Sequence, residues 1–294
     1  MNKMILVDLN QVMISNLMMQ IGGKKNIAVE EDLVRHMVLN SLRIYRTKFF
    51  KKYGELVICC DDKNYWRREL FPYYKIHRKK DRDESGLDWN MIFTVLNGIR
   101  DDIREKFPYK VIQIEHAEAD DIIGSLCHRF GHLGITNGSA EPILILSSDK
   151  DFMQLQKYAN VEQYSPMQKK FITCSNPARY MHEHILKGDR GDGVPNFLSD
   201  DDVFVNVNGK RQKPLATKKI DAWNGMKPED YCDERMLRNY RRNQQLVDLD
   251  FIPEDIQNEA NEIFDNYKLN ERGKIFNYFI EKKMKNMMEV IGDF

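Results

Sequence analysis

The sequence predicts an α/β protein in which a largely parallel central sheet is flanked by helices and followed by a smaller helical domain. Short apolar runs alternate with longer segments of helical periodicity through the first part of the chain. Two of the first four runs stop directly at an aspartate, and the fourth leads within three residues to Asp149 and then Asp151. From about residue 177 onward the pattern becomes helical, strand-poor and charged. We therefore expect an α/β domain over residues 1–180 and a helical domain over residues 181–294.

The individual elements follow from the spacing of apolar residues. Strand-length apolar runs lie at 4–7, 56–60, 111–114 and 143–146, and a hairpin-like pair lies at about 161–164 and 171–173. Helical periodicity covers about 29–53, 87–106 and 118–126, and Pro108 ends the second of these helices. Strands that alternate with helices favour parallel pairing, because the helix returns the chain to the same edge of the sheet.

Composition limits the class of protein. The chain has 294 residues, of which 42% are hydrophobic and 31% charged, with a net charge of zero, so it can form a substantial core. Its apolar runs are too short to span a bilayer, and nothing before the first strand is typical of a secretory signal, so we expect a cytosolic protein. The five cysteines fit neither a zinc site nor a disulfide framework, which favours reduced thiols.

Carboxylates gather where the expected strands end. They follow the first, second and fourth strands and the loop after the third, at Asp8, Asp61, Glu118, Asp120, Asp121, Asp149 and Asp151. In an open α/β sheet, sites form outside the carboxyl ends of the strands, so we expect these side chains to converge. Each alone could be a turn former or a helix cap, and Asp120 with Asp121 also suits a helix amino terminus. The same placement on every strand favours one shared site.

Divalent cations suit such a group of carboxylates. Anions held close together without partners repel one another and raise each other's pKa. Oxygen ligands favour Mg²⁺ or Mn²⁺ over zinc, and two such ions about 4 Å apart would hold the attacking and leaving oxygens of a phosphodiester displacement. The carboxylates therefore predict a metal-dependent nuclease.

A basic, aromatic stretch separates the second strand from the following helix. Residues 63–82 carry eight Lys or Arg against two acidic residues, and five aromatic side chains are interleaved with them. Cations that follow phosphates and aromatic faces that stack on bases suit single-stranded nucleic acid, although a solvated surface loop can have the same composition. Beside a carboxylate site, we favour the nucleic-acid interpretation.

A second acidic, glycine-rich segment lies early in the helical part. Asp189 and Asp192 are three residues apart, and Gly191 with Gly193 permits a tight turn whose backbone N–H groups can approach a phosphate. Basic residues that suit a grip on a duplex backbone follow at Lys210, Arg211, Lys213, Lys218 and Lys219. We interpret the histidine pairs 128/132 and 182/184 as ordinary surface or partly buried residues, since neither has a third ligand at a convincing spacing.

Five short motifs occur in a specific order: Ile5–Asp8, Tyr65–Arg68, Glu118–Asp121, Ser147–Phe152 and Leu186–Asp189. Together with Tyr164–Met167 and Arg272–Ile275, they make the chain resemble the 5′ nuclease (flap endonuclease) family, and within it the ribonuclease H group of the T-even bacteriophages. The resemblance spans nearly the whole chain. It implies a PIN-like nuclease domain followed by a helical domain with a helix–three-turn–helix element.

The resemblance also implies roles for particular residues. The first metal site would comprise Asp8, Asp61, Asp120 and Asp149, supported by Glu118 and Asp121, and the second would comprise Asp151, Asp189 and Asp192. Lys75 and Arg78, at the foot of a basic arch over about 63–90, would act in catalysis with Asp120 and Asp149. Tyr74 would stack on a terminal base, and further nucleic-acid contacts are implied for Arg67, Arg68, Lys79, Lys80, Gly191, Gly193, Lys210 and Arg211.

The implied cofactors are two Mg²⁺ ions, for which Mn²⁺ can substitute, and a K⁺ ion at the turn 188–194. The glycine-rich run of the family is only partly kept, because Asn196 and Phe197 follow Pro195 and acidic residues occupy 200–202. The implied reaction is hydrolysis that leaves a 5′-phosphate, as 5′–3′ exonuclease, flap endonuclease and ribonuclease H. It would remove RNA primers and 5′ flaps during lagging-strand replication.

Expected partners are DNA and RNA–DNA duplexes with 5′ ends, nicks or flaps, bound by a monomer in the cytoplasm of an infected host cell. A single-strand-binding protein or a sliding clamp is a further expected partner, and the closing residues 290–294 could form such a contact or a terminal strand or frayed tail. Two alternatives stay open: a catalytically inactive relative that binds branched DNA, and a phosphatase with an aspartyl nucleophile. The phosphatase needs a second aspartate two residues after the first, and Asn10 stands there.

Overall fold

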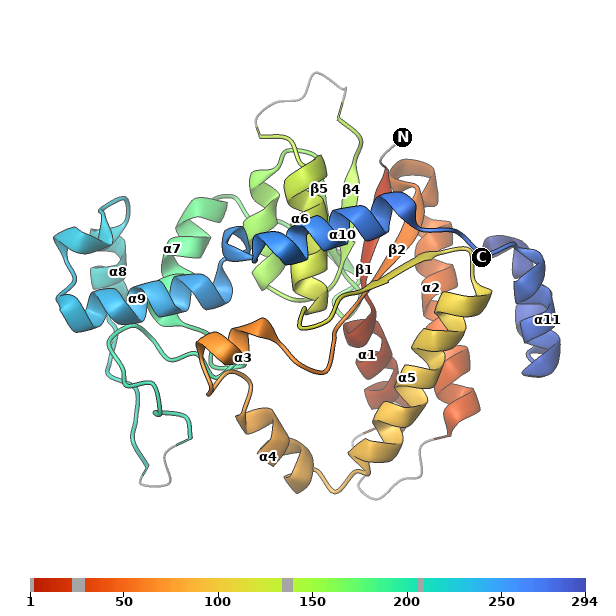
Figure 1. Cartoon of the computed structure of the whole chain (residues 1–294), viewed down its shortest axis with the longest axis horizontal. Coiled ribbons are helices and arrows are strands. Elements are labelled where there is room, and N and C mark those ends of the chain that lie inside the picture. Colours follow the sequence, from red (N-terminus) through yellow and green to blue (C-terminus); the bar gives the residue numbers. More distant parts are fainter. Residues whose placement is uncertain (1–2, 23–29, 134–139, 206–208) are drawn as a thin grey trace.

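A single mixed sheet forms the centre of the computed structural model, which describes residues 3–22, 30–133, 140–205 and 209–294 (Figure 1). Its strand order within the described residues is β3-β2-β1-β4-β5-β6. The strands are β1 (Met4–Asp8), β2 (Glu55–Cys60), β3 (Lys110–Gln113), β4 (Ile143–Leu146), β5 (Val161–Ser165) and β6 (Lys170–Ile172). All neighbours pair in parallel except β5 and β6, which are antiparallel. The predicted α/β fold with a largely parallel sheet is confirmed.

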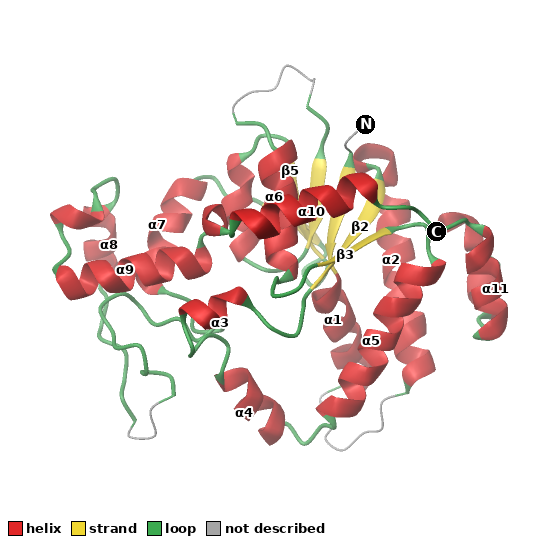
Figure 2. Ribbon diagram, in the orientation of Figure 1, coloured by secondary structure: helices red, strands yellow, loops and turns green. Residues whose placement is uncertain are grey.

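Both faces of the sheet are covered by helices (Figure 2). Alternate side chains of each strand face opposite layers. On one face, Ile5 and Val7 pack with α1 (Leu9–Ile21), α2 (Glu31–Tyr53), α5 (Trp89–Lys106) and α11 (Gly273–Glu281). On the other, Met4 and Leu6 pack with α6 (Ala119–Phe130) and α10 (Glu254–Asn266). The core therefore lies in two layers, one on each side of β1.

The sequence pattern located most of these helices but not α1. The helices expected at 87–106 and 29–53 are present as α5 and α2, and residue 29 lies outside the described part of the chain. Asp88 caps α5, since its side chain accepts a hydrogen bond from Met91 N at 3.0 Å. Helix α1 has apolar residues on most sides, so it shows little of the periodicity that identifies an amphipathic helix.

A smaller group of helices lies to one side of the sheet and is built around α7 (Pro177–Lys187), α8 (Thr217–Trp223) and α9 (Glu234–Val247) (Figure 1). Helix α7 begins at Pro177 after Asn176, whose side chain accepts a hydrogen bond from Arg179 N at 2.9 Å. A turn at 188–194 follows α7, and the next described helix is α8. Two small apolar clusters hold this group together.

The last part of the chain returns to the α/β body. Leu249 and Ile252 pack against the α6 layer, whereas Tyr278, Phe279 and Phe294 pack in the α5 layer. Phe294 is fully buried, with its ring 5.6 Å from that of Phe107. Residues 291–293 form a short 3-10 helix, so the alternatives of a terminal strand and a frayed tail are wrong, whereas a partner contact of residues 290–294 stays a prediction. The domain boundary near residue 180 stays a prediction.

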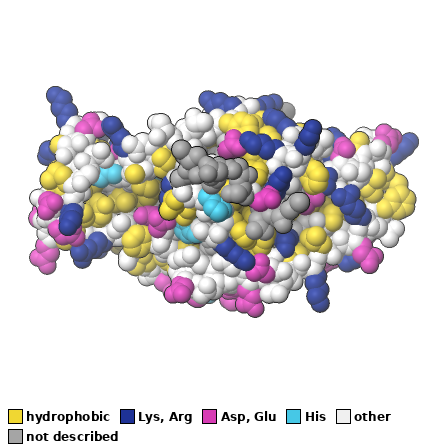
Figure 3. Space-filling model, turned by 90° about the horizontal axis from the view of Figure 1, so that it is seen from above, with side chains coloured by type: hydrophobic (Ala, Val, Ile, Leu, Met, Phe, Trp, Pro, Cys, Tyr) yellow, Lys and Arg dark blue, Asp and Glu magenta, His cyan; other side chains and the backbone are white. Residues whose placement is uncertain are grey.

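The surface at the amino ends of the strands carries both signs of charge. Seen from this side, Lys and Arg side chains of the described residues are interspersed with Asp and Glu (Figure 3). This mixture agrees with the zero net charge of the chain. Among the described helices, none has the length and apolar character that crossing a membrane requires.

Candidate active site

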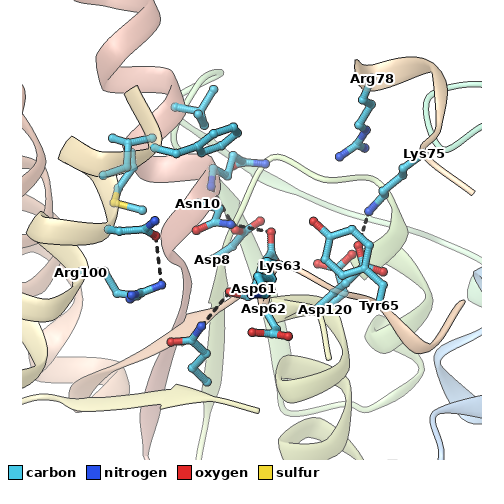
Figure 4. A pocket seen from close by; sticks show the side chains of 18 of the residues that line it. Asp8, Asn10, Asp61, Asp62, Lys63, Tyr65, Lys75, Arg78, Arg100 and Asp120 are labelled. Carbon is cyan, nitrogen blue, oxygen red and sulfur yellow. Dashed lines mark hydrogen bonds and ion pairs between the residues drawn. The ribbon is translucent and has the colours of Figure 1, made fainter. Parts of the chain in front are cut away.

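The acidic side chains meet where the order of the strands reverses. The chain runs outward from β1 to β2 and β3 on one side, and to β4 and β5 on the other, so the carboxyl ends of β1 and β4 flank a crevice. A cleft of about 1050 Å³ opens there. Acidic residues at its floor are Asp8, Asp61, Glu118, Asp120 and Asp149, as Figure 4 shows for three of them.

Asp8 and Asp61 are held in place by donors from neighbouring elements. Asp8 ends β1 and caps α1, accepting hydrogen bonds from Gln11 N at 3.1 Å and Ser147 Oγ at 3.2 Å. Asp61 follows β2 and accepts from Asn10 Nδ2 at 2.6 Å and from the backbone N–H of Ala119 at 2.7 Å. Each carboxylate therefore stands at a strand end in an orientation set by its neighbours.

Three of the carboxyls repel one another without an adequate counter-charge. Burial, with the charges of Asp61 and Asp149, raises the pKa of Asp8 from 3.8 to about 7. Burial and the neighbouring Asp151 raise the pKa of Asp149 to about 6. Burial, Asp149 and Asp8 hold the pKa of Asp120 well above its usual range. The arrangement fits a divalent cation, which would supply the missing positive charge.

Glu118 and Asp121 are neutralised within the protein. Glu118 accepts hydrogen bonds from Arg67 Nη1 at 3.1 Å and Tyr74 Oη at 3.0 Å, and it is paired with Lys75 Nζ. Asp121 accepts from Arg67 Nη2 at 2.7 Å and from the backbone N–H of Glu118 at 2.9 Å. Asp121 is fully buried and its oxygens face the guanidinium of Arg67, so its position suits the supporting role expected for it, which stays a prediction.

Two residues expected at the nucleic-acid surface lie inside the protein instead. Arg67 is 3% exposed and also donates to the backbone carbonyl of Leu246 at 2.9 Å. Tyr74 is 3% exposed, and its hydroxyl donates into the buried acidic network. This burial argues against contacts of Arg67 and Tyr74 with nucleic acid, and both roles stay predictions. Both build the frame of the site.

The foot of the basic arch is tied directly to the turn 188–194. Lys75 has a positive φ of 55°, and its backbone N–H donates to the carbonyl of Asp192 at 2.8 Å. Arg78 Nη2 lies 2.6 Å from Asp192 Oδ1. Burial opposes ionisation of Asp192, but Lys75 and Arg78 outweigh it and lower the pKa of this carboxyl. The carboxylate of Asp192, which was expected in the second metal site, is thus paired with Lys75 and Arg78 of the arch.

The arch itself is ordered as two short helices, α3 (Trp66–Leu70) and α4 (His77–Glu84). It passes below the carboxyl ends of the strands and leads to α5 (Figure 1). Arg78 of α4 and Trp89 and Phe93 of α5 all line the cleft. Lys75 and Arg78 point toward the carboxylates from the arch side, as Figure 4 shows. The cleft therefore combines an acidic floor with cationic and aromatic walls.

A second acidic group lies beside the first. Ligand atoms of Asp151, His184 and Asp189 lie within 4.8 Å of one another. A neighbouring cleft contains all three, and Asp149 and Gln11 line both clefts. His184 was missed from the sequence, although its position in the last turn of the helix before Asp189 could have indicated it. Asp149 thus connects the two groups.

Most of the other residues expected to touch nucleic acid are exposed. Arg68, Lys79, Lys80, Gly191, Lys210 and Arg211 lie at the surface. Gly193 is buried instead, and a side chain there would meet the carbonyl of Tyr73 and the ring of His77. Contacts of these residues with nucleic acid stay a prediction.

The acidic residues 200–202, which depart from the family pattern, form ion pairs with basic residues, and Asp200 and Asp201 do so with arginines of α9. Asp200 pairs with Arg235, and Asp201 pairs with Arg238 and Arg242. Asp202 accepts from Lys210 Nζ at 3.0 Å. This segment therefore packs onto the helical group through ion pairs.

Comparisons with known proteins agree with this geometry. The family described as 5′–3′ exonuclease, N-terminal resolvase-like domain matches residues 4–184, and the family described as T4 RNase H, C terminal, matches residues 175–294. Ribonuclease H of Enterobacteria phage T4 is 34% identical over 298 residues, covering 98% of this chain and 95% of that protein. A 5′–3′ exonuclease of Buchnera aphidicola is 27% identical over 197 residues, covering 58% of this chain and 64% of that protein.

Two solved structures share the fold. The T5 D15 protein co-crystallised with metal ions aligns with a TM-score of 0.58 at 15% identity, and covers 90% of this chain and 99% of that one. The T5 5′-exonuclease with bound zinc aligns with a TM-score of 0.55 at 17% identity over the same shares. The matched families cover the chain from residue 4 to its last residue, and the acidic cleft suits divalent cations. The chain belongs to the 5′–3′ exonuclease family, as a metal-dependent nuclease with a carboxyl-terminal region of the T4 RNase H type.

Proposed function

We propose that the chain is a Mg²⁺-dependent, structure-specific 5′ nuclease that acts as exonuclease, flap endonuclease and ribonuclease H on RNA primers and 5′ flaps during lagging-strand replication. One observation carries the proposal: Asp8, Asp120 and Asp149 share a charge that the protein leaves uncompensated, at the floor of a cleft with a basic arch along one wall. A phosphodiester brings further negative charge, so cations are needed for it to approach this floor.

The ligand atoms support Mg²⁺ as the resident ion. The first position would be held by Asp8, Asp61, Asp120 and Asp149, which offer oxygen only. The second would use the carboxylates of Asp149, Asp151 and Asp189. When bound, the cations activate water and stabilise the negative charge that develops on the phosphate. A K⁺ ion at the turn 188–194 stays a prediction, which DNA binding in K⁺ against Na⁺ would test.

The chain's own residues orient the substrate and stabilise its charge. Lys75 is held by Glu118 and lies beside the carboxylate floor, so a phosphate entering the cleft can accept a hydrogen bond from its ammonium group. Arg78 is half exposed and can turn from Asp192 toward the same phosphate. Trp89 and Phe93, which also line the cleft, offer apolar faces to bases of a single strand. Lys79 and Lys80 extend the cationic path along α4.

Exposed groups on the helical side suit a duplex. Lys210 and Arg211 lie at the surface of that part of the chain and can contact phosphates without reading the bases. The arch foot and the turn 188–194 are hydrogen-bonded to each other, so a duplex on the turn would place its 5′ strand beside the cleft. We propose that the protein binds DNA as a monomer, with any single-strand-binding protein or clamp docking away from the buried Phe294.

The structure also bears on the two alternatives. A phosphatase of this kind would need a second aspartate two residues after Asp8 for proton transfer, but Asn10 stands there and donates its amide to Asp61. An inactive relative is disfavoured because the four carboxylates expected at the first metal position, Asp8, Asp61, Asp120 and Asp149, all line the cleft. We therefore favour the active nuclease.

The test uses end-labelled DNA carrying either a 5′ flap or a 3′ flap on matched duplexes, with Mg²⁺ or with EDTA. Cleavage only near the 5′ end and only with Mg²⁺ is expected. Asp120→Asn should bind the 5′ flap and fail to cut it, whereas Glu115→Gln, at an exposed carboxylate outside the cleft, should cut normally. Cleavage of both flaps, or a full-rate Asp120→Asn protein, would contradict the proposal.

A further inference from the structure

His184 lies in the last turn of α7 and faces the second acidic group. Its Nε2 atom is 3.1 Å from Asp151 Oδ1. Gly188 ends the helix with a positive φ of 65°, which turns the chain so that Asp189 comes back beside the helix end. The imidazole and the two carboxylates therefore arrive from α7, from the turn after it, and from the loop after β4.

The orientation of the imidazole is suited to binding one metal ion together with Asp151 and Asp189. The His184 side chain is 12% exposed, and its ring stacks on Tyr180 with centroids 5.5 Å apart and planes at 20°. Nε2 is buried, and among the described residues it has no hydrogen bond of acceptable geometry in spite of its closeness to Asp151. Because His184 Nε2 lies close to the Asp151 carboxylate without a hydrogen bond between them, both groups could bind the same metal ion.

The spacing agrees with a divalent cation. Ligand atoms at about 2.1 Å from an ion lie about 3 Å apart when adjacent and about 4.2 Å apart when opposite each other. The atoms of Asp151, His184 and Asp189 lie within 4.8 Å of one another, so small rotations of the side chains would let all three contact one ion. Asp149 lines the same cleft and offers a fourth ligand.

We propose that His184 supplies a nitrogen ligand to the second metal position, so that this position prefers Mn²⁺, Co²⁺ or Zn²⁺ to Mg²⁺ while the first position remains an oxygen-only site. The inference rests on the proposed function for the presence of two metal positions. Imidazole nitrogen binds borderline cations such as Mn²⁺ and Zn²⁺ more readily than Mg²⁺, which prefers oxygen and retains its water. The identity of residue 184 would thus decide which ion completes the pair.

The direct test is pulsed electron paramagnetic resonance of Mn²⁺ bound to the full chain without nucleic acid. A coordinated imidazole couples its ¹⁴N nucleus to the electron spin, and this modulation is expected in the wild-type protein. His184→Gln should lose it. His182→Gln, two residues away on the same helix and bonded to the carbonyl of Ile220, should keep it.

Titration calorimetry supplies the second readout. We expect His184→Gln to weaken Mn²⁺ binding at one position by about 10- to 100-fold and Mg²⁺ binding by less than about threefold. His184→Glu should bind both ions again with oxygen ligands only, and so lose the preference for Mn²⁺. Circular dichroism and thermal unfolding identify any variant that fails to fold, and the wild-type spectrum decides the question without a variant.

Each outcome has one meaning. Mn²⁺ bound to the wild-type protein without nitrogen coupling, or no Mn²⁺ bound at all, would overturn the inference. Equal losses of Mn²⁺ and Mg²⁺ affinity in His184→Gln would overturn the selectivity and indicate that His184 acts only as a counter-charge to Asp151. Nitrogen coupling in a protein that does not cut 5′ flaps would leave His184 a ligand and reject the nuclease function. Cleavage with Mg²⁺ in a protein without nitrogen coupling would reject the inference alone.

Discussion

Replacing Asp8 by asparagine is expected to stabilise the metal-free protein and to abolish cleavage at the same time. Asp8 is 8% exposed, and burial together with the charges of Asp61 and Asp149 raises its pKa from 3.8 to about 7. Asparagine removes this charge but keeps the shape of the side chain. It is also a good helix cap, so the backbone N–H of Gln11 keeps its acceptor. The substitution therefore isolates the electrostatic effect of the carboxylate.

The sign and the size of the effect follow from proton linkage. Because the pKa is higher in the folded state, that state holds the Asp8 proton more tightly, and wild-type stability falls as the pH rises from about 4 through about 7. At about 1.4 kcal/mol for each tenfold change in proton affinity, full ionisation destabilises the protein by up to about 4 kcal/mol. Water and salt enter the cleft and screen this repulsion, so we expect a gain on the order of 2 kcal/mol at pH 8.

Equilibrium urea denaturation in EDTA at pH 5 and pH 8 measures the gain. It should be less than half as large at pH 5, where Asp8 of the folded wild-type protein is mostly protonated. Mg²⁺ should then reverse the order of stability, because the cation binds the folded wild-type protein more tightly than the variant. Glu115→Gln, at an exposed carboxylate, is the control and should leave the free energy of unfolding unchanged at both pH 5 and pH 8. An Asp8→Asn protein less stable than the wild type at pH 8, or a gain independent of pH, would refute the reasoning.

Three further substitutions test the frame around the site. Arg67→Ala should reduce the free energy of unfolding by about 3–5 kcal/mol, because it leaves Asp121 buried and unpaired; urea denaturation measures this. Gly188→Ala should destabilise the turn by about 1–3 kcal/mol and weaken binding of a 5′-flap duplex in a fluorescence titration, because φ is 65° and a side chain would collide with two backbone carbonyls. Phe294→Ala should destabilise by about 3–5 kcal/mol in the same urea assay, since it empties a fully buried position.

Each of these substitutions has a matched control in the chain. Arg68→Ala removes an exposed arginine next to Arg67 and should change stability by less than about 0.5 kcal/mol. Gly98→Ala lies in α5 with open space around it and should stabilise the protein by about 0.5–1 kcal/mol. Phe276→Ala removes a side chain that is 47% exposed and should have little effect. Equal losses in a substitution and its control would contradict the corresponding explanation.

The elements that could be predicted were those with a local signature. Runs such as Ile143–Leu146 are strand-length and uniformly apolar, and in the structure they are buried on both faces of the sheet. Helix α5 shows one apolar face and a capping aspartate, so both its period and its start were visible. Helix α1 has buried apolar residues at helical spacing, but Ile14, Met18 and Met19 add apolar residues on its other sides, so the contrast between an apolar and a polar face is weak. Its helical form depends on packing against β2 and α2.

The floor of the site could be predicted for a geometric reason, and the residues behind it could not. Parallel strands end at one edge, so aspartates that follow β1, β2 and β4 must be neighbours whatever the loops do. Within the basic stretch, by contrast, Arg67 and Arg68 look equivalent in sequence. Arg67 is buried against Asp121 and Arg68 is exposed, because α3 turns only Arg67 toward α6.

The sequence by itself determined the alternation of strands and helices and the placement of Asp8, Asp61, Asp120 and Asp149 at one sheet edge, because apolar periodicity and chain direction are local properties. Only the tertiary structure decided which charges neutralise one another. Tyr74 and Asp192 are 118 residues apart in sequence, yet they share a hydrogen bond of 2.9 Å. His184 of α7 likewise lies 3.1 Å from Asp151, which belongs to a different element. Pairing of buried polar groups depends on distances between segments that no local pattern encodes, so only the tertiary structure separates the carboxylates that are paired with Lys or Arg from those left without a counter-charge.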